Sequence, residues 1–313
     1  MLHLVGIGAA NVDLLLYVSR FPLPDQETSV TQFHMQGGGS AANVAVGVSR
    51  LGLSSGFIGN IGEDHFGDYL KKEFEKEGVD TTHLRRVKEK TGVAVCIVNS
   101  KGEREIYAYG EANAQLAPAQ IDEAYIANAK ALYLSSLQGR EAFETLARAS
   151  KTAARSGLVV YFDPGYIFVE KGLTALRRIF SSSTILKFNE SEIKDLTGKK
   201  DLHSASAKIL SLGPKIVLTT LGARGCHVRT KDVSTILPTY KRFKAVDRTG
   251  AGDSFNAGFI SGHLRGMDLE RSVRFGNLVA SVSVTKRGAR STPSFDELKR
   301  MREFNEFSGK FQN

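Results

Sequence analysis

The chain has 313 residues, 42% of them hydrophobic, which is enough to bury the core of one large α/β domain, alone or with a small appendage. Its formal charge of +9 comes from scattered basic residues, which favours solvated surface charge and an anionic substrate over a nucleic-acid platform. No apolar run approaches the roughly 18 residues that a membrane span needs.

Cys96 and Cys226 lie far apart, each in an apolar, strand-like run. This usage predicts neither a disulfide framework nor a zinc site, and we expect two buried thiols in a reducing compartment. The N-terminus lacks the pattern of a signal peptide, so a cytoplasmic location is expected.

Short apolar runs alternate with helical patterns, which is typical of a mainly parallel sheet covered by helices on both faces. The expected buried strands are 2–7, 55–58, 131–133, 158–162, 185–188 and 216–219. The expected helices are 41–51, 66–77, 119–127, 141–156, 173–179, 190–197, 204–212, 251–265 and 269–285.

Two segments, 11–37 and 91–110, break this alternation. Each contains adjacent extended runs joined by a turn, and the second has its turn at 100–102. Such runs predict antiparallel strands. They form either a small sheet that stands off the main domain, as a lid with an apolar face for a second subunit, or an extension of the main sheet.

The segment 247–253, DRTGAGD, directly precedes a predicted helix. A glycine-rich turn that opens a helix presents backbone N–H groups at the positive end of the helix dipole, which suits an anion. The carboxylate of Asp253 would repel a phosphate, so it is better suited to remove a proton from a hydroxyl that attacks that phosphate. The alternative interpretation is an ordinary helix start with an acidic first turn.

A second glycine-rich segment, 37–45 (GGGSAANVA), also precedes a predicted helix. Its glycines allow close approach of a ligand to the backbone, and Asn43 offers a donor and an acceptor to vicinal hydroxyls.

Upstream, the segment 6–13 (GIGAANVD) approaches a dinucleotide-binding fingerprint, but Asn11 replaces the third glycine of that fingerprint and a predicted strand follows. Asn11 and Asp13 are instead typical of a polar pair for a polyol at the end of a strand.

These segments, in this order, resemble the two signatures of the ribokinase/PfkB family of carbohydrate kinases, and the resemblance extends over 2–295. It implies a ribokinase-like three-layer αβα core (1–10, 38–90 and 111–313) with a mainly parallel sheet, plus a β-sheet lid (11–37 and 91–110). The N-terminal signature continues through Gly52 and Gly62. Arg248 departs from the family, which usually has a small residue there.

The resemblance also implies roles for individual positions. Asp253 corresponds to the catalytic base, and the backbone amides of Gly250, Ala251 and Gly252 correspond to the anion hole. The implied substrate-binding residues are Asn11, Asp13, Gly38, Gly39, Asn43 and Arg104. The implied nucleotide-binding residues are Asn189, Thr220, Gly222, Gly225 and Asn277. The implied metal-site residues are Asn189 and Glu192, which organise Mg²⁺ through waters, and Asp247 and Thr249, which resemble a K⁺ loop of several members.

The implied activity is transfer of the γ-phosphate of ATP to a hydroxyl of a small sugar, by a homodimer paired through its lid strands. A nucleoside kinase on the same scaffold and a ligand-binding member without catalysis remain alternatives, although the intact Asp253 disfavours the latter. Tyr166 and Phe168, without an arginine, follow the strand 158–162, which favours a neutral sugar or a nucleoside over a sugar acid. Tyr107 and Tyr109 share one strand face and would either stack on a base or sugar or pack in a dimer.

The chain lacks the strings that two other phosphotransferase classes require. It contains no G-x-x-x-x-G-K-[ST] and no H-R-D with D-F-G. A P-loop NTPase and a protein kinase are therefore excluded.

Overall fold

A computed structural model describes residues 1–101 and 103–311, so Gly102 in the predicted hairpin turn lies outside the described residues. The centre of the molecule is a ten-stranded sheet in the order β14-β13-β12-β11-β10-β9-β1-β4-β5, with β6 also paired to β4. Its strand pairs are parallel except at one edge, where β12, β13 and β14 are antiparallel. The sheet is thus mainly parallel, as predicted.

All the predicted strands are present in this sheet, and β1 has the predicted bounds. The ten strands are β1 Leu2–Ile7, β4 Ser55–Gly62, β5 Val79–Asp80, β6 Leu84–Val87, β9 Ala129–Ser135, β10 Val159–Asp163, β11 Ile185–Asn189, β12 Ile216–Thr220, β13 Cys226–Arg229 and β14 Ser234–Leu237. Successive strand residues point to opposite faces, so Leu4 belongs to one hydrophobic core and Val5 to the other.

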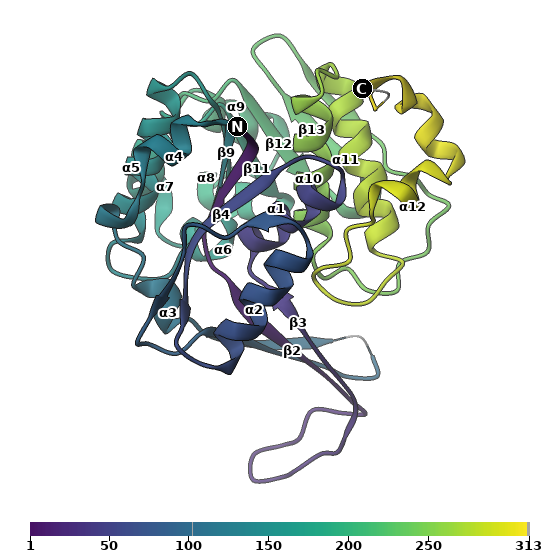
Figure 1. Cartoon of the computed structure of the whole chain (residues 1–313). Helices are drawn as coiled ribbons and strands as arrows, with labels where there is room; N and C mark the ends of the chain where they lie inside the picture. Colours follow the sequence, from purple (N-terminus) through teal and green to yellow (C-terminus); the bar gives the residue numbers. More distant parts are fainter. Residues whose placement is uncertain (102, 312–313) are drawn as a thin grey trace.

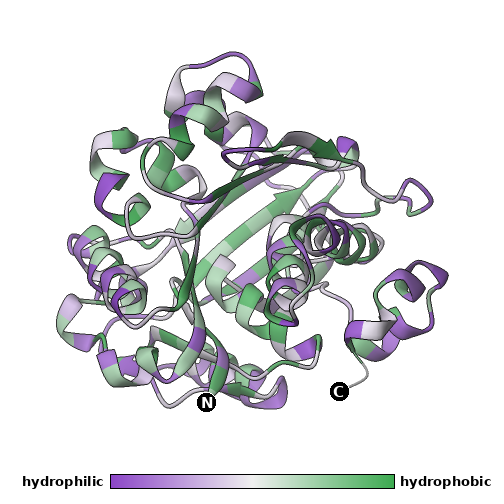
Figure 2. Cartoon of the chain, turned by 90° about the horizontal axis from the view of Figure 1, so that it is seen from above, coloured by the Kyte–Doolittle hydropathy of each residue, from purple (hydrophilic) through white to green (hydrophobic). Residues whose placement is uncertain are grey.

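Helices pack on both faces of the sheet, with apolar strands between them (Figure 2). One core includes α1 Ser40–Arg50, α2 His65–Lys76, α10 Ala251–Leu264, α11 Leu269–Ser283 and α12 Phe295–Lys299. The other includes α4 Glu123–Ala127, α5 Ala142–Arg155, α6 Gly165–Val169, α7 Gly172–Phe180, α8 Glu190–Thr197 and α9 Leu202–Leu210. None of the helices in the described part of the chain has the length and apolar character to cross a bilayer.

The predicted helix 119–127 is wrong in extent. A 3₁₀ turn, Pro118–Gln120, ends before Ile121, and α4 begins afresh after Asp122. The side chain of Asp122 accepts a hydrogen bond from the backbone N–H of Tyr125, so it caps the N-terminus of the second element.

The two irregular segments form a separate four-stranded sheet in the order β3-β2-β7-β8, which projects from the core (Figure 1). Its strands are β2 Asn11–Val18, β3 Val30–Gly38, β7 Gly92–Val98 and β8 Arg104–Tyr109. The two hairpins are antiparallel as predicted, but they join through a parallel β2–β7 pair. The strands therefore do not extend the main sheet.

The pairing register assigns the side chains of the small sheet to two faces. Asp13 lies opposite Gln36 and Ala94, and Ala94 lies opposite Ala108, so these residues share one face. Leu14 lies opposite Met35 and Val95, and Val95 lies opposite Tyr107, so these share the other. We call these the Asp13 face and the Tyr107 face.

Candidate active site

The N-terminus of α10 is open to a ligand. Gly250, its N-cap residue, has a φ of +73°, and no side chain within the described ranges caps the helix. A Cβ at Gly250 would lie 2.1 Å from the carbonyl oxygen of Ala289, so this turn needs glycine for both its conformation and its packing. The N–H of Ala251 donates to the carbonyl oxygen of Arg248 at 3.2 Å, whereas those of Gly250 and Gly252 have no partner within the described residues and are available to an anion.

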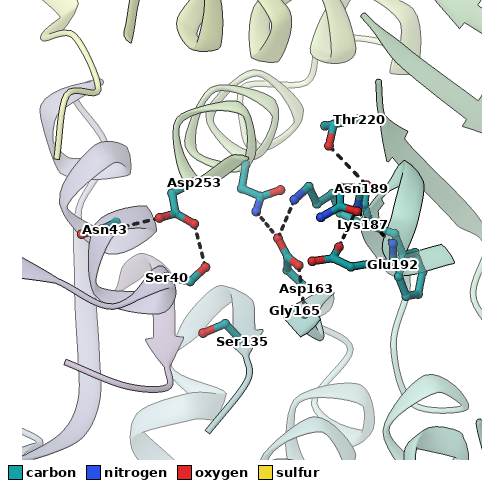
Figure 3. A network of polar contacts seen from close by, with 12 residues as sticks. Ser40, Asn43, Ser135, Asp163, Gly165, Lys187, Asn189, Glu192, Thr220 and Asp253 are labelled. Atoms are coloured by element: carbon teal, nitrogen blue, oxygen red, sulfur yellow. Dashed lines mark hydrogen bonds and ion pairs between the residues drawn. The ribbon is translucent and has the colours of Figure 1, made fainter. Parts of the chain in front are cut away.

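Asp253 lies in the first turn of α10, and its carboxylate is held by the start of α1 (Figure 3). Ser40 Oγ donates to one carboxylate oxygen at 2.7 Å, and Asn43 Nδ2 donates to the other at 2.9 Å. Burial raises the pKa of Asp253 to about 6, although both hydrogen bonds favour the ionised form. The group is therefore oriented and has the proton affinity of a weak base near neutral pH.

Asp13 provides a second carboxylate near Asp253. Burial raises its pKa to about 7; the charge of Arg290 opposes this shift and the charge of Asp253 adds to it. Gly38 makes room for it, because a Cβ there would lie 2.1 Å from Asp13 Oδ1. Asn11, two residues earlier on β2, accepts a hydrogen bond from Asn113 Nδ2 at 2.7 Å. The predicted polar pair thus lies beside the predicted base.

Arg104 links the small sheet to the loop before α10. Its Nη1 donates to Thr249 Oγ1 at 3.4 Å, and by register it belongs to the Asp13 face. Within that loop, Asp247 accepts from the backbone N–H of Thr249 at 2.8 Å and of Gly288 at 2.9 Å. Asp247 therefore ties two loops together at the start of α10.

The expected aromatic lining after β10 is only partly present. Phe168 is fully buried and stacks on Phe143 with a centroid distance of 4.4 Å, so it belongs to the core. Tyr166, on the same short helix α6, is exposed. Phe168 was a wrong choice for the site because an apolar residue after a strand fits the core equally well.

Four of the five predicted nucleotide-binding residues converge on a cavity of about 350 Å³ beside α10. Thr220, Gly222, Gly225 and Asn277 all line it, together with Ala251 and Gly252. Asn277 Nδ2 donates to the carbonyl oxygen of Leu237, which fixes the end of β14 against α11. The segment around Tyr240, Lys241 and Phe243 lines the same cavity, and no sequence motif marked it.

Asn189 and Glu192 form a capping box at the start of α8. Asn189 Oδ1 accepts from the backbone N–H of Glu192 at 2.9 Å, and Glu192 Oε2 accepts from that of Asn189 at 2.7 Å. Burial and the nearby charge of Asp163 raise the pKa of Glu192. Asn189 also borders a hollow with Thr220 and Gly222, which line the cavity beside α10 as well.

The sequence did not predict a buried polar network that lies next to the glycine-rich turn at Gly250–Gly252. Lys187 Nζ donates to Asp163 Oδ2 at 2.9 Å, and Asn256 Nδ2 donates to the same oxygen at 2.8 Å. A Cβ at Gly252 would lie 3.1 Å from Lys187 Nζ, so this cation lies beside the glycine-rich turn. A lysine within the apolar run of β11 was the available signal, since buried lysines are rare.

Known proteins resemble this chain over nearly its whole length. The model of the pfkB family carbohydrate kinases matches residues 1–295. The ribokinase of Haemophilus influenzae is 33% identical and covers 92% of this chain and 94% of its own. The ATP-dependent ribose-1-phosphate kinase of Halopiger xanaduensis is 32% identical, with coverages of 95% and 96%. The structure of Arabidopsis thaliana ribokinase with ribose and ATP has a TM-score of 0.83 and 29% identity, covering 94% of this chain and 96% of its own.

These matches agree with the open helix terminus, the oriented carboxylate and the adjoining cavity. The fold is the ribokinase-like three-layer fold with a small β-sheet. The chain therefore belongs to the pfkB family of carbohydrate kinases and is an ATP-dependent carbohydrate kinase.

Proposed function

We propose that this kinase phosphorylates a hydroxyl of a small neutral sugar, with Asp253 as the general base. The observation that carries the proposal is the position of Asp253, which lies between the acceptor-side residues Asn43 and Asp13 and the open N-terminus of α10. A base there can take the proton of an acceptor hydroxyl while the hydroxyl oxygen attacks the γ-phosphorus of ATP held at the helix terminus. The bond from that phosphorus to the β-phosphate oxygen breaks in the same transfer, and ADP leaves.

The residues around the transfer have separate tasks in this proposal. Ser40 and Asn43 hold the carboxylate of Asp253 so that it faces the acceptor. The backbone N–H groups of Gly250 and Gly252 stabilise the negative charge on the transferring group, and that of Ala251 joins them by releasing the carbonyl oxygen of Arg248. Lys187, beside Gly252, adds positive charge at the same place. The proton stays on Asp253 Oδ until the product leaves.

The charge of the acceptor side supports a neutral substrate. Asp13 and Asp253 are both carboxylates, and Asn11, Gly38, Gly39 and Asn43 carry no charge. Arg104, the one cation among the expected ligands, already donates to Thr249 Oγ1. A phosphate or carboxylate on the acceptor would meet like charge there. A ketose or pentose offers hydroxyls, which Asn11 and Asp13 can bind as acceptors and donors.

A nucleoside remains the second candidate substrate, but the position of Tyr107 and Tyr109 argues against their stacking on its base. Tyr107 and Tyr109 belong to the Tyr107 face of the small sheet, opposite the face that carries Asp13. They cannot stack on a base bound beside Asp13 while the strand keeps this register. Tyr166 remains the exposed aromatic near the end of β10.

The residues at α8 fit the Mg²⁺ that accompanies ATP. Asn189 and Glu192 offer amide and carboxylate oxygens beside the nucleotide cavity, and the capping box prevents α8 from fraying. When bound, Mg²⁺ would neutralise the charge of the phosphates, and Asn189 and Glu192 would hold it through water molecules rather than by direct contact.

Asp247 and Thr249 are the residues that we propose for a monovalent cation such as K⁺, at the loop that precedes α10.

The small sheet is the proposed lid and dimer interface, with the domain limits given above. Its Tyr107 face exposes apolar side chains, among them Phe33 at 58% and Tyr107 at 60%. A monomer rarely keeps such a patch in water, and pairing with a second copy would cover it. The Asp13 face then remains over the acceptor, where it excludes water during transfer.

A coupled assay of ADP release with Mg²⁺ tests the function. The acceptors are ribose, fructose, 2-keto-3-deoxygluconate, ribose 1-phosphate, adenosine, inosine and cytidine. We expect turnover with a neutral sugar and at least about 10²-fold loss in Asp253→Asn, with ATP binding retained by calorimetry. Asp195→Asn, an exposed change on α8, is the matched control. Turnover confined to ribose 1-phosphate would overturn the neutral-sugar proposal, and an active Asp253→Asn would overturn the base.

A further inference from the structure

Arg290 is a buried arginine that neither glycine-rich motif includes. It lies in the loop between α11 and α12, and its guanidinium packs over the ring of Phe74 at 5.1 Å. Its Nη1 and Nη2 are inaccessible to solvent and have no hydrogen-bond partner among the residues that the structure describes. Burial lowers its pKa to about 10, so it stays charged at neutral pH.

The remaining nitrogen of Arg290 reaches the predicted base through one residue. Nε donates to Asn43 Oδ1 at 3.1 Å, and Asn43 Nδ2 donates to Asp253 Oδ2 at 2.9 Å. These two hydrogen bonds are compatible with only one orientation of the Asn43 side-chain amide. A flipped amide would place its NH₂ group against the guanidinium and its oxygen against the carboxylate, and both contacts are repulsive.

Neighbouring residues make room for Arg290, although burying its charged side chain is unfavourable. A Cβ at Gly37 would lie 2.1 Å from Arg290 Nη1, so the first glycine of the triplet makes room for the guanidinium. The carbonyl oxygen of Arg290 accepts from Arg50 Nη1 at 2.7 Å, which fixes the loop. A buried cation with unpartnered donors destabilises a protein, and its charge lowers the pKa of Asp13 against the effect of burial.

We propose that Arg290 is a positioning residue for phosphoryl transfer, acting on Asp253 through the side chain of Asn43. It holds the Asn43 amide in the orientation that keeps Asp253 aimed at the acceptor, and it does not bind the acceptor itself. The inference rests on the proposed function, because it concerns the same base and the same reaction.

Steady-state kinetics on the full-length enzyme test this role. In Arg290→Met we expect kcat to fall by about tenfold or more, with acceptor and ATP KM within about threefold, since a lost orientation affects the transition state. Arg290→Lys keeps a charge and a donor, so it should recover part of kcat. Arg265→Met is the matched control, because Arg265 also packs over an aromatic ring, Phe311, away from the site. It should lower thermal stability and leave kcat unchanged.

The double variant Asn43→Ala/Arg290→Met gives the sharper result. If Arg290 acts through Asn43, the double variant loses no more kcat than Asn43→Ala alone. Additive losses would overturn the proposal, and so would an Arg290→Met enzyme with normal kcat and a raised acceptor KM, which indicates direct acceptor binding.

A readout without turnover separates this inference from the proposed function. The side-chain amide of Asn43, identified in ¹H–¹⁵N spectra by its loss in Asn43→Ala, should be rigid in the wild type and mobile in Arg290→Met. An unchanged Asn43 signal in Arg290→Met refutes the positioning role. If no acceptor on the panel turns over, the proposed function fails while this measurement still decides the role of Arg290.

Discussion

The pH dependence of turnover follows from the environment of Asp253. Burial raises its pKa from 3.8 to about 6, and a general base works only in its ionised form. At pH 5, a base with a pKa of about 6 is about one-tenth ionised, whereas one with an ordinary pKa would be more than about nine-tenths ionised. We therefore expect kcat to fall about tenfold from pH 7 to pH 5.

The assay is initial-rate ADP release at saturating substrates between pH 4.5 and 8. Asp13, with a pKa of about 7, should add a second acidic limb to kcat/KM for the acceptor, and Asp13→Asn should remove that limb alone. A kcat that stays level down to about pH 4.5 would refute the argument from burial, because it would give Asp253 its ordinary pKa.

Protonation of Asp253 and Asp13 does not itself favour unfolding in acid. Asp253 and Asp13 have folded-state pKa values above their ordinary values, so the folded protein binds protons more tightly than the unfolded chain at these sites. Their contribution to the free energy of unfolding therefore rises as pH falls from about 7 towards 4. Circular dichroism at each pH provides the control, and a protein that unfolds together with its kcat would contradict this reasoning.

Three further predictions concern stability and assembly. Lys187→Met leaves Asp163 buried without its cation and should lower the free energy of unfolding by about 3–5 kcal/mol, measured in urea; a loss below about 1 kcal/mol would contradict the buried pair. Gly250→Ala forces a strained φ and a clash with Ala289, so it should cost about 1–3 kcal/mol and most of kcat; a normal kcat would mean that the turn tolerates a side chain. Phe33→Glu charges the Tyr107 face and should convert a dimer into a monomer by light scattering; a wild-type protein that is already monomeric at micromolar concentration would refute the interface.

The sequence predicted most strands of the main sheet and part of the candidate active site. Strands such as β1 and β11 are short apolar runs whose burial on both faces leaves a clear signal. Asp253 and Asn43 were singled out because each follows a glycine-rich turn before a predicted helix, and the structure brings the two side chains within 2.9 Å of each other. The parallel join of β2 and β7 was not found, because hairpin patterns give local pairs and say nothing of how distant hairpins meet.

The residues that were missed depend on contacts between distant parts of the chain. Lys187 donates a hydrogen bond to Asp163, and Arg290 donates one to Asn43, which is 247 positions away in the sequence. No local pattern distinguishes such an arginine from a solvated one in a loop. Burial alone reveals it, and burial is known only after the fold is known.

The span of these contacts also affects how the enzyme matures. The pair Asn43–Asp253 joins residues 210 positions apart, and Arg290 extends the connection almost to the end of the chain. Contacts of such long range form late, because they close the largest loops. A partly refolded chain can thus assemble β-strands while its base is still unaligned. Kinase activity should return after the recovery of secondary structure, which makes catalysis a reporter of the last folding step.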